Sequence, residues 1–436
     1  MGDTIVIKGG NRLTGEIELQ GSKNSSLPIL AATVLVDGIS EIHNCPDLTD
    51  VSAAISILTH LGCKVERQGN TVTVDSRFIS LHSIPDSLMR EMRSSIVFLG
   101  SILGRMGQVR LSSPGGCEIG LRPIDLHISA LREMGVTVDE GRGQISCQRE
   151  RPFKSSVISL SFPSVGATEN IILASALGEG RTVILNAARE PEIRDLADFL
   201  CKCGCRVEVT GQGTVIIDAV KKAHGTSHSV IPDRIAALSY LSSVGSVGGD
   251  VLIKNTDTTD YRTVLPFFEA AGCEITDSIS SIRIKMNKRP SALRDIRTMP
   301  YPGFPTDAQA PLMAMACVAK GSSMIVENIF EGRFKHVGEL VRMGAKIRLE
   351  GKVALIEGTE SLYGTDVECP DLRGGAALVV AGLAAKGVTR IHSVFHIDRG
   401  YERLEECLRS VGAEIVRENS EFGMRNSELR ARELIK

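Results

Sequence analysis

Along the chain, short segments in which apolar and polar residues alternate begin just after six similarly placed glycines. The first is Cys63-Lys64-Val65-Glu66, which follows Gly62 and an apolar stretch ending in "LTHL". Glycine after a periodic apolar segment is typical of a left-handed helix cap, and strict alternation is typical of a half-exposed strand. The pattern returns at intervals of 73, 69, 68, 72 and 68 residues, at Gly135, Gly204, Gly272, Gly344 and Gly412. The chain is therefore predicted to contain six repeats of a helix followed by a strand.

A second series of glycines has the same period. Gly38, Gly107, Gly180, Gly249, Gly321 and Gly387 each follow a segment rich in Ala, Ile or Leu and precede a strand-like segment such as "RTVILN". Each repeat of about 70 residues thus holds two helices and several strands, which predicts an α/β fold. Such units are too long for a solenoid of stacked short repeats. Six of them favour two globular halves of three repeats, divided near residues 229–234, with a small-molecule site where the halves meet.

Composition narrows the class of protein. The 436 residues are 42% hydrophobic and 23% charged, with a formal net charge of -2, as expected of a soluble globular protein. A balance of this kind argues against nucleic acid or an anionic membrane as the main partner. The most apolar stretch, "GGAALVVAGLAA", is too short to span a bilayer and predicts a buried helix. The N-terminus "MGDTIVIKGG" lacks the pattern of a signal peptide, so a cytoplasmic location is expected.

The eleven cysteines do not form a metal-binding or disulfide pattern. No two are spaced as CxxC, and Cys201, Cys203 and Cys205 alternate with other residues, unlike zinc ligands. Most are therefore expected to be reduced thiols that fill the core or lie at the surface. Neither a metal nor a cofactor is implied.

The residues with candidate chemistry are those that do not recur from repeat to repeat. Lys23 and Asn24 open a helix, where an anion could bind, although a solvated surface lysine is the simpler alternative. Asp307 in "FPTDAQAP" could equally be a helix N-cap. Further candidates in irregular loops are Arg93, Cys117 in "SSPGGCEIGLRP", Arg122, Asp125, His127, Ser164, Thr168, Arg333, Arg373 and Arg399. Together these side chains suit a small substrate that carries phosphate and carboxylate groups.

Motifs along nearly the whole chain resemble those of a known family, both in their residues and in their order. "GSKNSSLPIL", "PGGCEIGLRPIDLH", "PSVGATEN", "AAREPEIRDLADFL", "FPTDAQA" and "HIDRGYERLE" are similar to motifs of the enolpyruvyl transferases. The PGGC segment separates the UDP-N-acetylglucosamine 1-carboxyvinyltransferases from the related shikimate-pathway synthase. The resemblance implies an inside-out α/β barrel of two domains, each with three βαβαββ units. It places residues 24–231 in the first domain and residues 1–23 plus 232–436 in the second, with the active site in the cleft between them.

The resemblance also implies a reaction and roles for individual residues. UDP-N-acetylglucosamine and phosphoenolpyruvate would be the substrates, with no nucleic acid, membrane or obligate protein partner. Cys117 would give a proton to C3 of phosphoenolpyruvate, and Asp307 would be the general base. Lys23, Arg122 and Arg399 would hold phosphoenolpyruvate, with Arg93, Arg333 and Arg373 extending that cluster. The nucleotide sugar would be contacted by Asn24, Arg122, Pro123, Asp125, Leu126, Ser164, Val165, Gly166, Asp307 and Ile329. Glu190, Asp233 and His127 match polar positions near the site without an assigned role.

Two segments depart from the family pattern. After Asp233-Arg234 the chain reads "IAALSYL", and "DLRGGAAL" is richer in glycine than usual. These departures leave open a paralogue that binds the nucleotide sugar but turns it over weakly. An enolpyruvyl transferase with another acceptor is the second alternative, against which Cys117 and residues 163–166 count.

Overall fold

The computed structural model describes residues 2–112, 124–141, 143–149, 155–293 and 295–418. The chain divides into two compact units. The inserted unit runs from Gln20 to Pro232, and the terminal unit contains the chain up to Leu19 and from Asp233 onward. Each unit has its own hydrophobic core.

The inserted unit holds three sheets and the helices that pack between them. Its helices are α1 (Lys23–Ala32), α2 (Thr49–His60), α3 (Asp86–Glu91), α4 (Phe98–Met106), α5 (Asp125–Glu133), α6 (Val165–Ser175) and α7 (Pro191–Lys202), with the 3-10 turns η1 (Thr33–Leu35) and η2 (Arg93–Val97). Its strands are β3 (Ile39–His43), β4 (Lys64–Gln68), β5 (Thr71–Asp75), β6 (Ser83–Ile84), β7 (Gln108–Ser112), β8 (Thr137–Gly141), β9 (Gln144–Gln148), β10 (Ser156–Ser159), β11 (Arg181–Leu185), β12 (Arg206–Val209), β13 (Thr214–Asp218) and β14 (Ser227–Ser229).

The terminal unit is built in the same way. Its helices are α8 (Arg234–Val247), α9 (Leu265–Ala271), α10 (Thr306–Cys317), α11 (Val337–Arg342), α12 (Leu372–Ala384) and α13 (Leu404–Ser410), with η3 (Thr258–Tyr261) and η4 (Val394–Arg399). Its strands are β1 (Thr4–Lys8), β2 (Leu13–Glu18), β15 (Gly249–Lys254), β16 (Glu274–Asp277), β17 (Ser281–Met286), β18 (Ile296–Arg297), β19 (Ser322–Val326), β20 (Lys346–Glu350), β21 (Val353–Glu357), β22 (Leu362–Tyr363), β23 (Asp366–Glu368), β24 (Ala385–Lys386), β25 (Val388–His392) and β26 (Glu414–Glu418).

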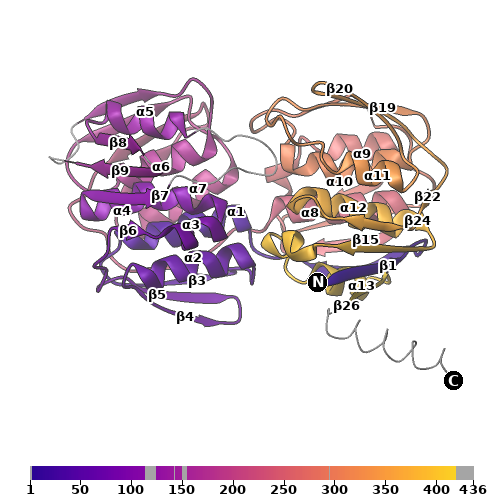
Figure 1. Ribbon diagram of the computed structural model, residues 1–436, viewed down its shortest axis with the longest axis horizontal. Helices are drawn as coiled ribbons and strands as arrows, with labels where there is room; N and C mark the ends of the chain where they lie inside the picture. Colours follow the sequence, from indigo (N-terminus) through magenta and orange to yellow (C-terminus); the bar gives the residue numbers. More distant parts are fainter. Residues whose placement is uncertain (1, 113–123, 142, 150–154, 294, 419–436) are drawn as a thin grey trace. The chain divides into compact units, whose positions relative to one another are not determined.

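All six four-stranded sheets in the described ranges share one topology. An edge strand pairs in parallel with its neighbour, and the next two pairs across the sheet are antiparallel. Examples are the sheets with strand order β6-β7-β9-β8 and β10-β11-β13-β12. The N-terminal strands complete two sheets of the terminal unit: β1 lies between β25 and β26, and β2 pairs with β15. Figure 1 shows the indigo β1 beside the yellow C-terminal strands. This regularity confirms the predicted α/β fold of six βαβαββ repeats.

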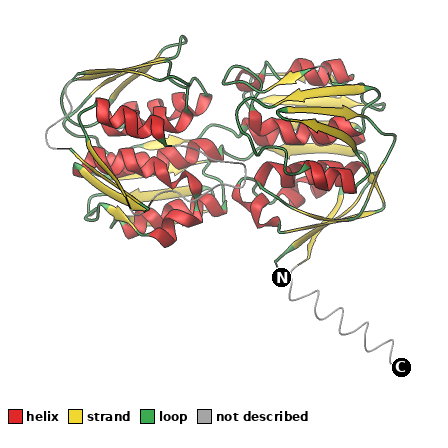
Figure 2. Ribbon diagram, turned by 45° about the horizontal axis from the view of Figure 1, so that its top comes forward, coloured by secondary structure: helices red, strands yellow, loops and turns green. Residues whose placement is uncertain are grey.

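In each unit helices pack against the sheets (Figure 2). Three helices are central in each unit: α4 packs against both α1 and α6 in the inserted unit, and α8, α10 and α12 pack against one another in the terminal unit. Nearly every residue of α6 and α12 is buried, as expected of a helix that is apolar all round. The segment "GGAALVVAGLAA" lies in α12 and its end, which confirms the predicted buried helix.

The glycine caps form as the sequence predicts. Gly62, Gly135, Gly204, Gly272, Gly344 and Gly412 all have φ between 85° and 104°, the left-handed region that favours glycine. In the second series Gly38 is the exception, because its φ is not positive. A Cβ on Gly38 would lie 2.8 Å from the backbone nitrogen of Gly225, so close approach explains this glycine.

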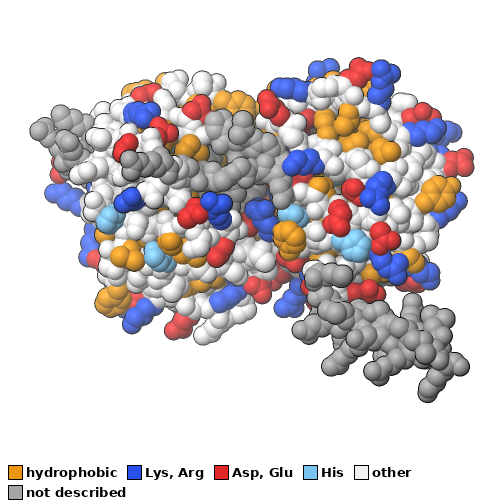
Figure 3. Space-filling model, in the orientation of Figure 1, with side chains coloured by type: hydrophobic (Ala, Val, Ile, Leu, Met, Phe, Trp, Pro, Cys, Tyr) orange, Lys and Arg blue, Asp and Glu red, His pale blue; other side chains and the backbone are white. Residues whose placement is uncertain are grey.

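The cysteines and the surface also agree with the sequence. None of the ten cysteines in the described ranges forms a disulfide, and eight of them are buried. Acidic and basic side chains are interspersed over the visible face of each unit (Figure 3). Within the described ranges, every helix is too short or too polar to cross a membrane.

Candidate functional site

The candidate residues gather at the N-terminal ends of the central helices. Lys23 is the first residue of α1, Val165 is the first of α6, and η2 leads into α4. In the terminal unit, Asp307 and Arg373 are the second residues of α10 and α12. Free N–H groups and the helix dipole make such ends favourable for anions. Each unit thus presents polar groups at one end of its three central helices.

Lys23 is not a solvated surface lysine. Only 8% of it is exposed, and its ammonium nitrogen lies 3.4 Å from the buried Asp50 carboxylate on α2. Ser22 caps the helix by accepting a hydrogen bond from the Ser25 backbone N–H. A lysine is seldom buried unless its ammonium is paired, as the Lys23 ammonium is with Asp50. The structure therefore excludes the simpler alternative for Lys23.

A buried carboxylate anchors the helix that carries Lys23. Ser25 donates to Asp195 on α7, which also accepts from the Ile231 backbone N–H at 3.2 Å and lies 2.8 Å from His228 Nε2. Serine, histidine and aspartate also form hydrolase triads, in which histidine takes the serine proton. Here serine bonds to the aspartate instead, so this cluster holds α1 in place and activates no nucleophile.

The start of α6 packs against His127. The Ser164 hydroxyl accepts from the Ala167 N–H and caps the helix. A Cβ on Gly166 would lie 3.0 Å from His127 Cε1, so a larger residue would crowd the ring. Thr168 is fully buried, where it donates to the Ser164 carbonyl and accepts from the Ala188 N–H. The Thr168 hydroxyl is therefore engaged in the local structure at the start of α6.

The tautomer of His127 follows from its neighbours. Asn170 Oδ1 accepts from the Gly100 N–H at 2.6 Å, which fixes the orientation of its amide. The Asn170 amide nitrogen then donates to His127 Nδ1 at 2.8 Å. Burial lowers the pKa of His127 to about 4. The imidazole is therefore neutral near pH 7, with its proton on Nε2 beside Gly166.

The buried His127 predicts a pH-dependent difference in stability. Between pH 4 and 6.5 the unfolded chain binds a proton at this residue that the folded protein does not. Relative to wild type, the His127→Gln variant should therefore gain about 2 kcal/mol in free energy of unfolding between pH 7.5 and 5.0. Urea denaturation of both proteins at the two pH values measures this gain, and other titrating groups cancel in the comparison. Parallel stability curves would refute the assignment.

In the terminal unit, Asp307 binds two buried arginines. Arg333 donates to one carboxylate oxygen, and Arg373 Nη2 donates to the other at 3.1 Å. Arg333 is 3% exposed and Arg373 2%, whereas Asp307 is partly exposed. The N-cap of α10 is Pro305, and Asp307 is already the second residue of the helix. The expected alternative of an N-cap role for Asp307 is therefore wrong.

Electrostatics keep Arg373 charged despite its burial. Burial, the largest single influence, lowers its pKa, but the charge of Asp307 together with Tyr401 and Asp233 raises the pKa above the usual value. Arg373 Nε and Nη1 and Arg333 Nε are buried without a hydrogen-bond partner in the described part of the chain. Buried guanidinium N–H groups of this kind are suited to an anionic ligand.

Glu327, which sequence reasoning missed, organises the loop before Arg333. One oxygen of its buried carboxylate accepts from the backbone N–H groups of Ile329 and Phe330 at 2.8 and 3.1 Å. The other accepts from the Thr306 hydroxyl at 3.0 Å, next to Asp307. Its one sequence signal is an acidic residue directly after a strand, in "MIVENIF". Glu327 thus sets the position of Ile329 relative to α10.

The remaining candidates vary in position. Asn24, Leu126 and Ile329 are partly buried, and Asp125 is exposed at the start of α5. Arg399 is the last residue of η4 and is partly buried. Glu190 is the N-cap residue of α7, and Asp233 caps α8 through the N–H groups of Ile235 and Ala236. Cys117, Arg122 and Pro123 lie outside the described residues, as does the side chain of Arg93.

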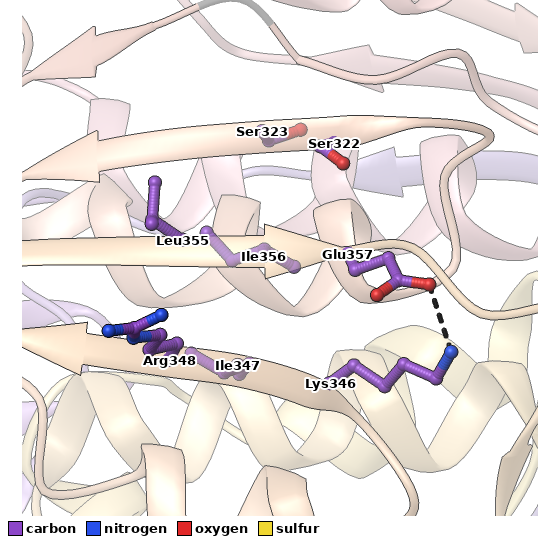
Figure 4. A pocket seen from close by; sticks show the side chains of 8 residues that line it. All are labelled: Ser322, Ser323, Lys346, Ile347, Arg348, Leu355, Ile356 and Glu357. Carbon is purple, nitrogen blue, oxygen red and sulfur yellow. Dashed lines mark hydrogen bonds and ion pairs between the residues drawn. The ribbon is translucent and has the colours of Figure 1, made fainter.

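A shallow depression on the terminal unit is a different kind of feature. It has a volume of about 450 Å³ and lies over β19, β21 and β20 (Figure 4). Its polar side chains include Lys346 and Glu357, which form an ion pair at 2.9 Å. It contains none of the candidate residues, so we assign it no role in the site.

Comparisons with known proteins identify the family of the chain. The sequence profile of the EPSP synthase (3-phosphoshikimate 1-carboxyvinyltransferase) family matches residues 7–408. "UDP-N-acetylglucosamine 1-carboxyvinyltransferase 2" of Caldanaerobacter subterraneus subsp. tengcongensis is 49% identical over 94% of this chain and 98% of its own. The enzyme of that name from Desulfovibrio desulfuricans is 43% identical over 95% of this chain and 99% of its own. The chain belongs to the UDP-N-acetylglucosamine 1-carboxyvinyltransferase family.

Solved structures of enolpyruvyl transferases share the fold of this family member. NikO from Streptomyces tendae superposes with a TM-score of 0.87 at 23% identity, over 96% of this chain and all of NikO. EPSP synthase from Acinetobacter baumannii gives a TM-score of 0.75 at 18% identity, over 96% of this chain and all of that one. At such identities the likeness concerns the fold. The predicted family and fold class are confirmed.

Proposed function

We propose that this protein transfers the enolpyruvyl group of phosphoenolpyruvate to the 3-hydroxyl of UDP-N-acetylglucosamine, releasing phosphate. This reaction is the first committed step of peptidoglycan precursor synthesis. The observation that carries the proposal is the near full-length match to relatives bearing this name. The arrangement of Asp307 between two buried arginines supports it, because a carboxylate and anion-binding groups lie together there.

In the proposed reaction the sugar hydroxyl oxygen attacks C2 of phosphoenolpyruvate while its proton passes to Asp307. C3 receives a proton from Cys117, which yields a tetrahedral adduct. C3 then loses a proton as the bond from C2 to the phosphate oxygen breaks, so phosphate leaves and the enol ether forms. A thiol suits the proton transfer to C3, because its usual pKa near 8.5 lets it hold a proton at neutral pH.

The proposed binding roles follow the resemblance to the family. Lys23, Arg122 and Arg399 are proposed to hold phosphoenolpyruvate, with electrostatic stabilisation of the charge that develops on it. Arg93, Arg333 and Arg373 extend this positive cluster. For the nucleotide sugar we propose Asn24, Arg122, Pro123, Asp125, Leu126, Ser164, Val165, Gly166, Asp307 and Ile329. The residues proposed for these roles come from both units.

The segment that departs from the family pattern lies in the core of α8. Ile235, Ala236, Ala237 and Leu238 are buried, and the Asp233 cap at the start of the helix is intact. The departure thus changes packing inside the terminal unit. It removes none of the side chains to which the proposal gives a role.

An acceptor assay tests the proposed function. Phosphate release from phosphoenolpyruvate should require UDP-N-acetylglucosamine and should not occur with shikimate 3-phosphate or without an acceptor. Tight binding of UDP-N-acetylglucosamine without phosphate release would indicate a binding paralogue. Release with shikimate 3-phosphate instead would indicate a different transferase.

Alkylation by the epoxide fosfomycin tests the role of Cys117. Burial raises the pKa of Cys147, Cys203 and Cys317 to about 12, so these thiols are poor nucleophiles. Cys201 is exposed and serves as the matched control. Mass spectrometry should find one adduct on wild type and on Cys201→Ala, and none on Cys117→Ala. The same labelling of Cys117→Ala and wild type would refute the assignment.

A further inference from the structure

One nitrogen of Arg373 bonds to Asp307, but something else must fix the plane of this guanidinium. Nη2 makes the bond to Asp307, while Nε and Nη1 have no hydrogen-bond partner in the described ranges. A single hydrogen bond leaves a planar group free to tilt about it. Tyr401 meets this need: the centre of its ring lies 5.4 Å from Arg373 Cζ, and a side-chain hydrogen bond between the two residues helps to raise the pKa of Arg373. This distance is within the range of a cation–π contact, which is stronger when both groups are buried.

Tyr401 is itself held at both ends. Its backbone N–H donates to the Ile397 carbonyl at 3.0 Å, and its hydroxyl lies 2.7 Å from the Ser239 hydroxyl on α8. Ser239 donates its one hydrogen to the Ile235 carbonyl at 3.1 Å, so Tyr401 donates to Ser239. The ring is 1% exposed, and Ser239 is 2% exposed. Tyr401 therefore has a fixed orientation against Arg373.

Gly400 allows the segment before Tyr401 to lie close to the start of α12. A Cβ on Gly400 would lie 2.7 Å from a methyl carbon of Leu372, the residue before Arg373. The contacts thus run from Ser239 on α8 through Tyr401 and Arg373 to Asp307 on α10. They link all three central helices of the terminal unit at the end where the candidate residues gather.

We propose that Tyr401 is a positioning residue, whose ring holds the Arg373 guanidinium in the plane in which it binds Asp307. The inference rests on the proposed function, because Asp307 is the base in that reaction. In this role Tyr401 acts through Arg373. Ser239 acts one step further away, by fixing the ring.

Three variants separate this role from core packing. Tyr401→Leu removes the ring and should lower kcat by about 10- to 100-fold, with KM values changed less than about threefold. Tyr401→Phe keeps the ring but loses the hydroxyl that bonds with Arg373, so its kcat should fall less than that of Tyr401→Leu and by no more than about tenfold. Tyr240→Leu is the matched control, because Tyr240 is an equally buried tyrosine on α8. Tyr240→Leu should lower the free energy of unfolding measured in urea, while its kcat stays within about threefold of wild type.

The pH profile adds a readout that a purely structural role would not move. With Arg373 misaligned, Asp307 is less well neutralised and should take up a proton at higher pH. The acid limb of kcat in Tyr401→Leu should therefore move upward by roughly half a pH unit. An unmoved limb, or equal losses of kcat in Tyr401→Leu and Tyr240→Leu, would overturn the proposal. A loss above tenfold in Tyr401→Phe would also overturn it, even if Tyr401→Leu did not fold.

A spectroscopic measurement distinguishes failure of this inference from failure of the proposed function. In protein labelled with ¹⁵N-arginine, the Arg373 Nε–H signal should show the ring-current shift of a group over an aromatic face. Arg373→Lys assigns the signal. The shift should persist in Tyr401→Phe and disappear in Tyr401→Leu, whether or not the protein turns over these substrates. A signal at the same position in wild type and Tyr401→Leu would refute the contact.

Discussion

The Asp307→Asn variant is expected to lose about a thousandfold in kcat while it stays folded. Asparagine has the same shape as aspartate, but its single oxygen can accept from only one of the two atoms that bind there, Arg333 Nη2 or Arg373 Nη2. It has no charge, and it cannot take the proton of the sugar hydroxyl, a step worth about 10²- to 10⁴-fold. It also leaves two buried guanidinium groups without a counter-charge. Phosphate release with both substrates saturating measures the loss.

The control for this prediction is Asp250→Asn in the same unit. Asp250 pairs with Arg283 at 2.7 Å on the surface of the sheet, where ion pairs contribute little. Its kcat should stay within about twofold of wild type. Circular dichroism and urea denaturation establish that each variant is folded. A folded Asp307→Asn that keeps kcat within about tenfold of wild type would contradict the role of Asp307.

The features that sequence predicts well are those set by local geometry. A helix end followed by a left-handed glycine involves a few consecutive residues, and all six predicted glycines of the first series adopt that conformation. The all-apolar segment in α12 indicates burial by composition alone. Gly38 shows the limit of this reasoning, because a neighbouring backbone from far along the chain explains it better than its own conformation.

The chemistry of individual side chains depends on residues distant in sequence. From sequence, Lys23 could have been a solvated surface lysine and Asp307 a helix N-cap. Their partners in the structure decide against both alternatives. Asp50 is 27 residues from Lys23, and Arg373 is 66 residues from Asp307. Nothing in the local sequence shows that these pairs meet. The sequence therefore indicates which loops could hold a site, but it does not show which side chains contact each other there.

Glu327, Ser239 and Tyr401 were missed for a related reason. In sequence they look like ordinary strand-end, helix and loop residues, and Tyr401 looks like a core aromatic. Their importance appears only when a chain of contacts is followed from one helix to the next. The resemblance to a family did not supply them either: Tyr401 lies within the "HIDRGYERLE" motif but received no role from it, and Glu327 and Ser239 lie outside the quoted motifs.

In the inserted unit, adding a single methyl group at Gly100 is expected to cause a large loss of stability. In Gly100→Ala the new Cβ would lie 2.3 Å from the Asn170 carbonyl oxygen and 2.9 Å from the Asn170 Cα. Both atoms belong to the backbone of α6, so the clash cannot be relieved by rotating a side chain. Helices α4 and α6 would have to separate in a core that is close-packed. We expect the free energy of unfolding to fall by about 3 kcal/mol or more.

Gly338→Ala provides a control with the opposite sign. Gly338 lies in α11, and a Cβ there would meet no atom within 4 Å. Alanine favours helix over glycine, so this variant should gain up to about 1 kcal/mol in urea denaturation. The same chemical change thus separates packing from helix propensity. Equal stability of Gly100→Ala and wild type would mean that α4 and α6 do not approach as closely as the structure shows.

The same substitution also connects packing to the site. The Gly100 N–H fixes the Asn170 amide, which in turn sets the His127 tautomer beside Gly166. If α4 moves away from α6, the hydrogen bond from the Gly100 N–H to Asn170 lengthens. The Asn170 amide is then no longer held in the orientation in which it donates to His127 Nδ1. Folded Gly100→Ala recovered at low temperature should therefore bind UDP-N-acetylglucosamine more weakly than Gly338→Ala, as isothermal titration calorimetry can measure. Unchanged affinity in both variants would separate the Asn170–His127 pair from the nucleotide-sugar site.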